Sequence, residues 1–147
     1  MSLTTKDTRT VADAITLTGS YVTQSSPAYF EITDIDQVNL DVSYTMGAAE
    51  TSNSLQLKVE FANPKNNDPV TADWHQQISE STSSGTTTIS LQSYTFAAVS
   101  AAATYDRFQI AIPVNSKFMR ISYKETGIAA NEGTLTLKAT LRQGSPD

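Results

Sequence analysis

The strongest constraint on this chain is a period-two alternation of apolar and polar residues that recurs in several short segments. Successive side chains of an extended strand point to opposite faces, so this alternation predicts β-strands with one buried face. The clearest segments are 38–44, 55–61, 108–112, 119–123 and 135–141. Their apolar residues occupy every second position, which predicts that these strands share one core.

Weaker alternation predicts four more strands, at 11–17, 29–33, 74–79 and 86–96. In the last of these the alternation slips after Leu91, and a bulge at Gln92 or Ser93 would restore the register. Gly, Asn, Pro and Ser separate the predicted strands and are typical turn residues. Helix signals are poor, because the Ala-rich stretch 97–103 is long enough for only one helical turn.

Eight or nine short strands with one polar face each predict an all-β fold, an antiparallel β-sandwich. A jelly-roll arrangement fits best. An immunoglobulin-like sandwich is the alternative, but its cysteine pair is missing and Trp74 lies between predicted loops. The predicted sandwich covers residues 11–142. Residues 1–10 are predicted to be an extended arm, either frayed or ordered on a neighbouring subunit, and residues 143–147 a short tail.

Composition excludes several classes of function. With 10 basic and 15 acidic residues the net charge is −5, which argues against non-specific nucleic-acid binding. The chain has no cysteine, so disulfides, zinc-thiolate sites and thiol nucleophiles are excluded. No apolar run reaches membrane-spanning length, and no phosphate-binding glycine loop occurs. We therefore expect no nucleic-acid partner, no membrane span, no cofactor and no small-molecule substrate.

Two places have residues that can support catalysis or metal binding. His75 is the only histidine and could serve as a general base, but no nucleophile elbow accompanies it. Asp34 and Asp36 share one face of an extended chain, where they could bind Ca²⁺ or act as paired carboxylates. The expected alternatives are an exposed histidine at the start of a strand and a solvated acidic turn. The loop at 66–68 is a weaker oxygen-rich site.

The charge distribution along the chain is uneven. Residues 1–100 have 4 basic and 11 acidic side chains, a balance of −7, whereas residues 101–147 have 6 and 4, a balance of +2. If the apolar positions of the last two strands face inward, then Arg120, Lys124, Lys138 and Arg142 face outward. Should those two strands be neighbours, the four cations form one stripe that can bind an acidic partner. A solubilising face that protects a sheet edge is the alternative.

The segment from 96 to 142 resembles small β-sandwich virion proteins of tailed bacteriophages, of the head-decoration or cement type. The resemblance lies in AAATYDRF at 101–108, IAIP at 110–113, FMRISYKE at 118–125 and GTLTL at 133–137. It implies a non-catalytic structural protein, a homotrimer that binds the major capsid protein on the outer surface of the virion and stabilises the shell.

Two other functions are alternatives to this one. A carbohydrate- or receptor-binding module, as at a tail-fibre tip, would use loop aromatics such as Trp74 and a Ca²⁺ site. A hydrolase would use Asp34, Asp36 or His75. For the structural protein we predict that Arg120, Lys124, Lys138 and Arg142 contact the partner.

Overall fold

The computed structural model describes the chain except residues 1–2, 65–67, 70–72, 98–102, 111–115 and 145–147, and for residues 3–6 and 103–110 it describes only the backbone. The described part contains strands and no helix, so the all-β prediction is confirmed. The strands are β1 (Leu3–Thr16), β2 (Val22–Thr23), β3 (Phe30–Glu31), β4 (Gln37–Thr45), β5 (Ser54–Ala62), β6 (His75–Gln76), β7 (Ile78–Ser83), β8 (Thr86–Leu91), β9 (Tyr94–Phe96), β10 (Ala103–Ile110), β11 (Phe118–Thr126) and β12 (Thr134–Gly144). No described segment forms a helix that could cross a membrane.

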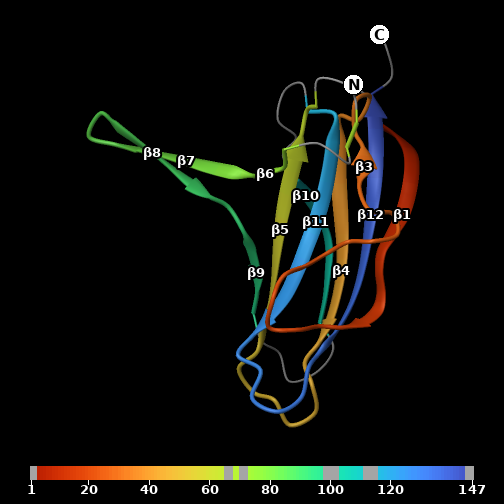
Figure 1. The fold of residues 1–147 in the computed structure, drawn as a ribbon, viewed down its shortest axis with the longest axis vertical. Coiled ribbons are helices and arrows are strands. Elements are labelled where there is room, and N and C mark those ends of the chain that lie inside the picture. The colour runs from red at the N-terminus through yellow and green to blue at the C-terminus, as the bar shows by residue number, and fades with distance from the viewer. Residues whose placement is uncertain (1–2, 65–67, 70–72, 98–102, 111–115, 145–147) are drawn as a thin grey trace.

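Two antiparallel sheets form the two layers of the body (Figure 1). Sheet A has the strand order β1-β12-β4-β10. Sheet B has the order β2-β11-β5-β6, and β3 also pairs with β11 while β9 also pairs with β5. A third sheet is the hairpin of β7 and β8, which projects from the body (Figure 1). The predicted β-sandwich is therefore confirmed.

The strand order is jelly-roll-like. β2 and β3 share one position beside β11, and β6 and β9 share one beside β5. Counted this way, the body has eight strand positions, and the chain passes from one sheet to the other at most of its connections. The described part has twelve strands where eight or nine were predicted, because two predicted strands are each divided into two and the short strand β2 was not predicted.

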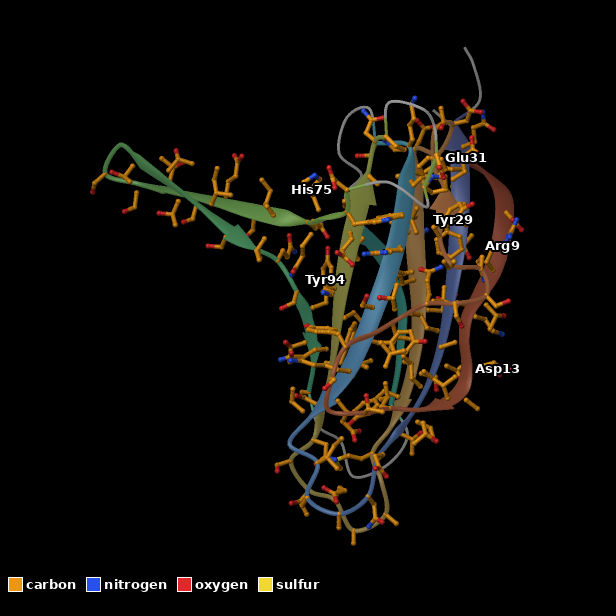
Figure 2. The ribbon with its side chains drawn as sticks, viewed as in Figure 1. Arg9, Asp13, Tyr29, Glu31, His75 and Tyr94 are labelled. Atoms are coloured by element: carbon orange, nitrogen blue, oxygen red, sulfur yellow. The ribbon has the colours of Figure 1, made fainter. Side chains whose placement is uncertain are left out.

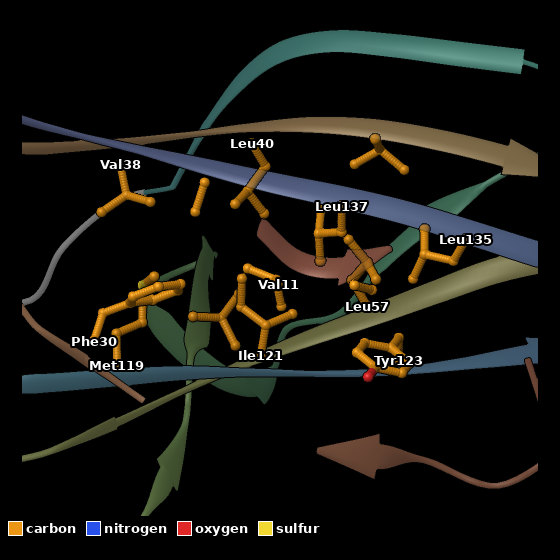
Figure 3. Close-up of a cluster of buried hydrophobic side chains, with 14 of the residues drawn as sticks. Val11, Phe30, Val38, Leu40, Leu57, Met119, Ile121, Tyr123, Leu135 and Leu137 are labelled. Carbon is orange, nitrogen blue, oxygen red and sulfur yellow. The ribbon is translucent and has the colours of Figure 1, made fainter. Parts of the chain in front are cut away.

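The core lies between the two sheets and follows the predicted alternation. Along β4 every second residue from Val38 to Tyr44 is buried, and β5 repeats the pattern. Leu57 of sheet B and Leu137 of sheet A are fully buried in this layer (Figure 3). Burying one such side chain contributes about 1.5–3 kcal/mol, so the alternating leucines, isoleucines and valines supply much of the driving force for folding.

The ends of the predicted sandwich are longer than the sequence indicated. Residues 3–10, predicted as an arm, lie in β1 and pair with β12 as far as Leu3 opposite Gly144. β12 continues to Gly144, two residues into the predicted tail. The pairing uses backbone hydrogen bonds, which need no apolar side chains, and the Thr-rich sequence of β1 suits an edge strand. The alternation of apolar residues therefore gave no sign that residues 3–10 form a strand.

The segments 74–79 and 86–96 are each divided between two strands. The first becomes β6 and the start of β7, and the second becomes β8 and β9. At Gln92 and Ser93, where a bulge was predicted, the chain leaves the hairpin and joins sheet B. The slipped alternation thus marks a change of partner.

The remaining predictions are met in part. Segment 29–33 contains only β3. In the predicted strand 108–112, β10 ends at Ile110, and residues 111–112 lie outside the described residues. Of the Ala-rich stretch, 98–102 likewise lies outside the described residues.

Candidate interaction surfaces

The four predicted partner-binding cations do not form one stripe. β11, which carries Arg120 and Lys124, belongs to sheet B, whereas β12, which carries Lys138 and Arg142, lies between β1 and β4 in sheet A. The prediction assumed that the last two strands are neighbours, but their connection crosses from one sheet to the other. The two pairs of cations therefore lie on the opposite outer faces of the sandwich.

The cations of sheet A are poorly suited to docking. Lys138 is exposed, but it stands directly opposite Asp41 on β4, and cross-strand pairs of opposite charge attract one another. Arg142 is half-buried, and its Nε is a buried atom without a hydrogen-bond partner among the described residues. Of these two cations, Lys138 thus has an acidic neighbour across the strands and Arg142 is only partly accessible.

Arg120 packs against the outer face of sheet B and is paired within the chain. Its Nε donates a hydrogen bond to Glu60 Oε1 at 3.1 Å, and only 28% of its side chain is exposed. Its guanidinium carbon lies 4.4 Å from the centroid of the Trp74 ring, a cation–π contact. Arg120 therefore holds Trp74 against the sheet, and the carboxylate of Glu60 compensates the charge of Arg120.

Two lysines flank Tyr21 on the same outer face. The Nζ atoms of Lys58 and Lys124 lie 4.8 and 4.6 Å from the centroid of the Tyr21 ring. We call Lys58, Tyr21 and Lys124 the lysine–tyrosine cluster. The Tyr21 hydroxyl donates to Gln56 Oε1 at 3.5 Å, and burial raises the pKa of this phenol. The ring attracts both ammonium groups through its π-face but does not neutralise them.

Lys58 was missed in the sequence analysis. It occupies an outward position of the strand predicted at 55–61, so its direction was predictable from the alternation, and in the structure it is half-buried. Its closeness to Lys124 was not, because it depends on the pairing of β5 with β11, in which Lys58 stands opposite Ser122. Strand order is set by packing of the whole molecule and has no local sequence signal.

The candidate catalytic residues are not brought together. His75 is exposed in β6 at the base of the projecting hairpin (Figure 2). Asp36 accepts a hydrogen bond from the Gly144 backbone at 2.5 Å, and its own N–H donates to the Arg142 carbonyl at 2.9 Å. Asp36 therefore connects the end of β12 to the turn before β4. These hydrogen bonds account for the position of Asp36 without a bound cation.

In the part of the chain that the structure describes, no group of three His, Asp or Glu residues is placed to hold a metal ion. Asp34 is exposed in the same turn as Asp36. In the weaker oxygen-rich loop, residues 66 and 67 lie outside the described residues.

A buried carboxyl group joins the two sheets at the end opposite to the chain termini. Glu125, on β11, is 1% exposed and accepts hydrogen bonds from the Tyr44 hydroxyl at 2.5 Å and the Gly133 backbone at 2.9 Å. Asn53 Nδ2 donates to it at 3.3 Å. These donors satisfy the carboxyl group inside the protein, so its role is structural.

Glu50 connects two loops at the same end. Its carboxylate accepts backbone hydrogen bonds from Ala129, Ala130 and Asn131 at 3.0, 2.7 and 2.8 Å. These three N–H groups lower the pKa of Glu50 to about 2. The contact joins the β4–β5 and β11–β12 connections, and only the tertiary structure shows it.

Comparisons with known proteins identify no relative of this chain. No family model matches the chain, and no curated protein or solved structure matches it significantly. Its function must therefore be argued from its own surfaces.

Proposed function

We propose that this protein is a non-catalytic structural protein of a bacteriophage virion, which attaches to the major capsid protein on the outer surface of the shell. The observation that carries the proposal is the lysine–tyrosine cluster on the outer face of sheet B. We further propose that it acts as a homotrimer and that binding stabilises the assembled shell, because a ligand that prefers the assembled state shifts the equilibrium toward it.

Electrostatics support docking through sheet B. The chain has a net charge of −5, so the molecule as a whole repels an acidic partner. Lys58 and Lys124 provide two positive charges close together, and the Tyr21 ring between them is an amphipathic side chain of the kind enriched at interfaces. The resemblance of segment 96–142 to head-decoration proteins supports the same function, and jelly rolls are frequent in viral shells, which is an argument by analogy.

The test is sedimentation of a lysate from the cells that produce the chain, followed by immunoblotting of the gradient. We expect the protein in a particle fraction that contains shells visible by electron microscopy. The double charge reversal Lys58→Glu/Lys124→Glu is expected to weaken binding to those particles roughly tenfold or more, because like charges across an interface cost several kcal/mol. Wild-type protein that stays at the top of the gradient contradicts the proposal.

The matched controls are single reversals on the two outer faces. Lys124→Glu on sheet B is expected to weaken particle binding, whereas Lys138→Glu on sheet A is expected to leave it unchanged. Circular dichroism of each variant checks that the sandwich is intact. Equal losses for both variants would show that the charge of the whole molecule, rather than sheet B, controls binding. Glycan binding that disappears in Trp74→Ala would instead favour the carbohydrate-binding function.

A further inference from the structure

The hairpin of β7 and β8 is a separate feature that the lysine–tyrosine cluster does not explain. Its strands pair with each other and with no other strand in the described residues, and it extends away from the sandwich (Figure 1). Two strands of six residues reach roughly 20 Å at the usual rise of an extended chain. An isolated two-stranded hairpin is at best marginally stable in water, so it requires a partner surface.

One face of the hairpin carries three apolar side chains, with Glu80 beside them. Ile78 stands opposite Leu91 and Glu80 opposite Ile89, so these four side chains share one face. Ile78, Ile89 and Leu91 are 48%, 61% and 69% exposed. The other face carries only Ser and Thr from Ser79 to Ser90. This segregation is the pattern of a strand pair with one covered face, yet within the chain nothing described covers it.

The base of the hairpin is firmly held, so its direction is defined. The buried Gln77 donates its backbone N–H to Val59 and accepts the Tyr94 hydroxyl at its side chain, at 2.8 and 2.9 Å. Gln92 N–H donates to the Gln77 carbonyl at 2.8 Å. The tip is a two-residue turn, Ser84 and Gly85, with φ of 50° and 76°, which matches the twist of a hairpin.

An apolar hollow lies at the base of the hairpin. It has a volume of about 310 Å³, and Phe61, Ala62, His75 and Ile78 contribute to its lining. Ile78 belongs both to this hollow and to the apolar face of the hairpin, so the two surfaces are continuous. The volume is at the lower limit for a small-molecule pocket and suits a few inserted side chains.

We propose that the hairpin binds a second copy of this chain, with Ile89 and Leu91 of one copy inserted into the hollow beside His75 of the next. One chain provides both the protruding apolar side chains and a matching hollow, as a contact between copies requires. Residues 78–91 contain a single charged side chain, Glu80, in a chain of net charge −5. Two copies can therefore approach here with little like-charge repulsion. The inference rests on the self-association part of the proposed function and not on capsid binding.

The first test is sedimentation equilibrium of the purified full chain over a concentration series. We expect the wild type to self-associate and Ile89→Thr/Leu91→Thr to raise the dissociation constant about tenfold or more, because two apolar anchors are removed. Threonine keeps the strand preference, and both sites are exposed, so the fold is retained. Val22→Thr, at an exposed apolar residue of the body, is the matched control.

The second test uses the absence of cysteine from the chain. Ile89→Cys and His75→Cys are purified separately, mixed and oxidised, so that a disulfide between the two variants can form only between different copies. We expect a cross-linked heterodimer, and none when Ser20→Cys replaces Ile89→Cys. A wild type that is monomeric throughout the series, or cross-linking equal to the Ser20 control, overturns the inference.

The two proposals fail in distinguishable ways. Loss of particle binding in Ile89→Thr/Leu91→Thr, with a wild type that is monomeric, would mean that the hairpin contacts the shell and not another copy. Self-association with no particle binding would retain the inference and overturn the capsid function.

Discussion

At the scale of single residues, two carboxyl groups stabilise the end of the sandwich opposite to the chain termini, each in a different way. Glu50 is half-buried and accepts three backbone hydrogen bonds from a neighbouring loop, whereas Glu125 is buried and links the two sheets. Neither contact follows from local sequence, because in each the partners are at least eight residues apart and most are more than seventy.

Glu50 predicts a specific loss of stability in acid. Its pKa of about 2 in the folded protein is lower than the ordinary value of 4.5, so its contribution is complete above pH 4.5 and is lost as the pH falls through about 2. We expect Glu50→Gln to lower the melting temperature at pH 7 and to differ little from wild type near pH 2. Thermal unfolding at several pH values measures this.

The control for this prediction is Glu132→Gln, which removes a charge from an exposed side chain in the β11–β12 connection, the loop that donates these hydrogen bonds. A Glu50→Gln variant whose pH dependence matches that of the wild type between pH 4.5 and 2 would show that the three hydrogen bonds do not stabilise the folded state.

Glu125 predicts a contrast between two substitutions. Glu125→Gln keeps an oxygen that can accept from Asn53 and Gly133, and its amide can donate to the Tyr44 hydroxyl, so we expect a loss below about 1 kcal/mol. Glu125→Ala leaves buried donors without acceptors and is expected to cost on the order of 3 kcal/mol. Urea denaturation compares the two variants, and equal losses would contradict the role of the hydrogen bonds.

At the scale of elements, the alternating strands carry the stability. Leu57 on β5 is fully buried against sheet A, whereas Leu91 on β8 is 69% exposed. We expect Leu57→Ala to lower the free energy of unfolding by about 2–5 kcal/mol. Leu91→Ala, with the same chemical change, is expected to alter it by less than about 0.5 kcal/mol when the protein is measured as a monomer. Similar losses at both sites would mean that the hairpin packs on its own body.

The strands were predictable where one face is buried and one is solvated. Segments 38–44, 55–61, 119–123 and 135–141 show this alternation, and the structure places their apolar residues in the core. Residues 3–10 were not predicted as a strand, because an edge strand rich in Thr is held by backbone hydrogen bonds. Of the hairpin, only parts were predicted, in the strand segments 74–79 and 86–96. Its projection from the body depends on where the chain enters and leaves sheet B.

At the scale of the whole molecule, strand order decides which residues form a surface. The outward positions of Arg120 and Lys124 on one strand and Lys138 on another followed from alternation. Their separation onto opposite faces did not, since the sequence does not encode which strands become neighbours except through the packing of the entire sandwich. For the same reason Lys58 joined the candidate site only in the folded chain.

The lysine–tyrosine cluster and the hairpin have different proposed roles. The lysine–tyrosine cluster lies on the outer face of sheet B, and the hairpin projects from the sandwich near β5 and β6. If both proposals hold, a copy attached to a shell through its cluster contacts a neighbouring copy through its hairpin. Contacts between copies on a symmetric lattice add to shell binding through multivalency, so many weak contacts can stabilise the assembly.

The most direct measurement of this account is electron cryomicroscopy of the particle with which the protein sediments, at a resolution that shows individual strands. If the protein docks through sheet B, Lys58 and Lys124 face the shell, on the side of the sandwich opposite to Lys138. A reconstruction in which sheet A lies against the shell, or shells that carry no copy of the protein, would contradict it.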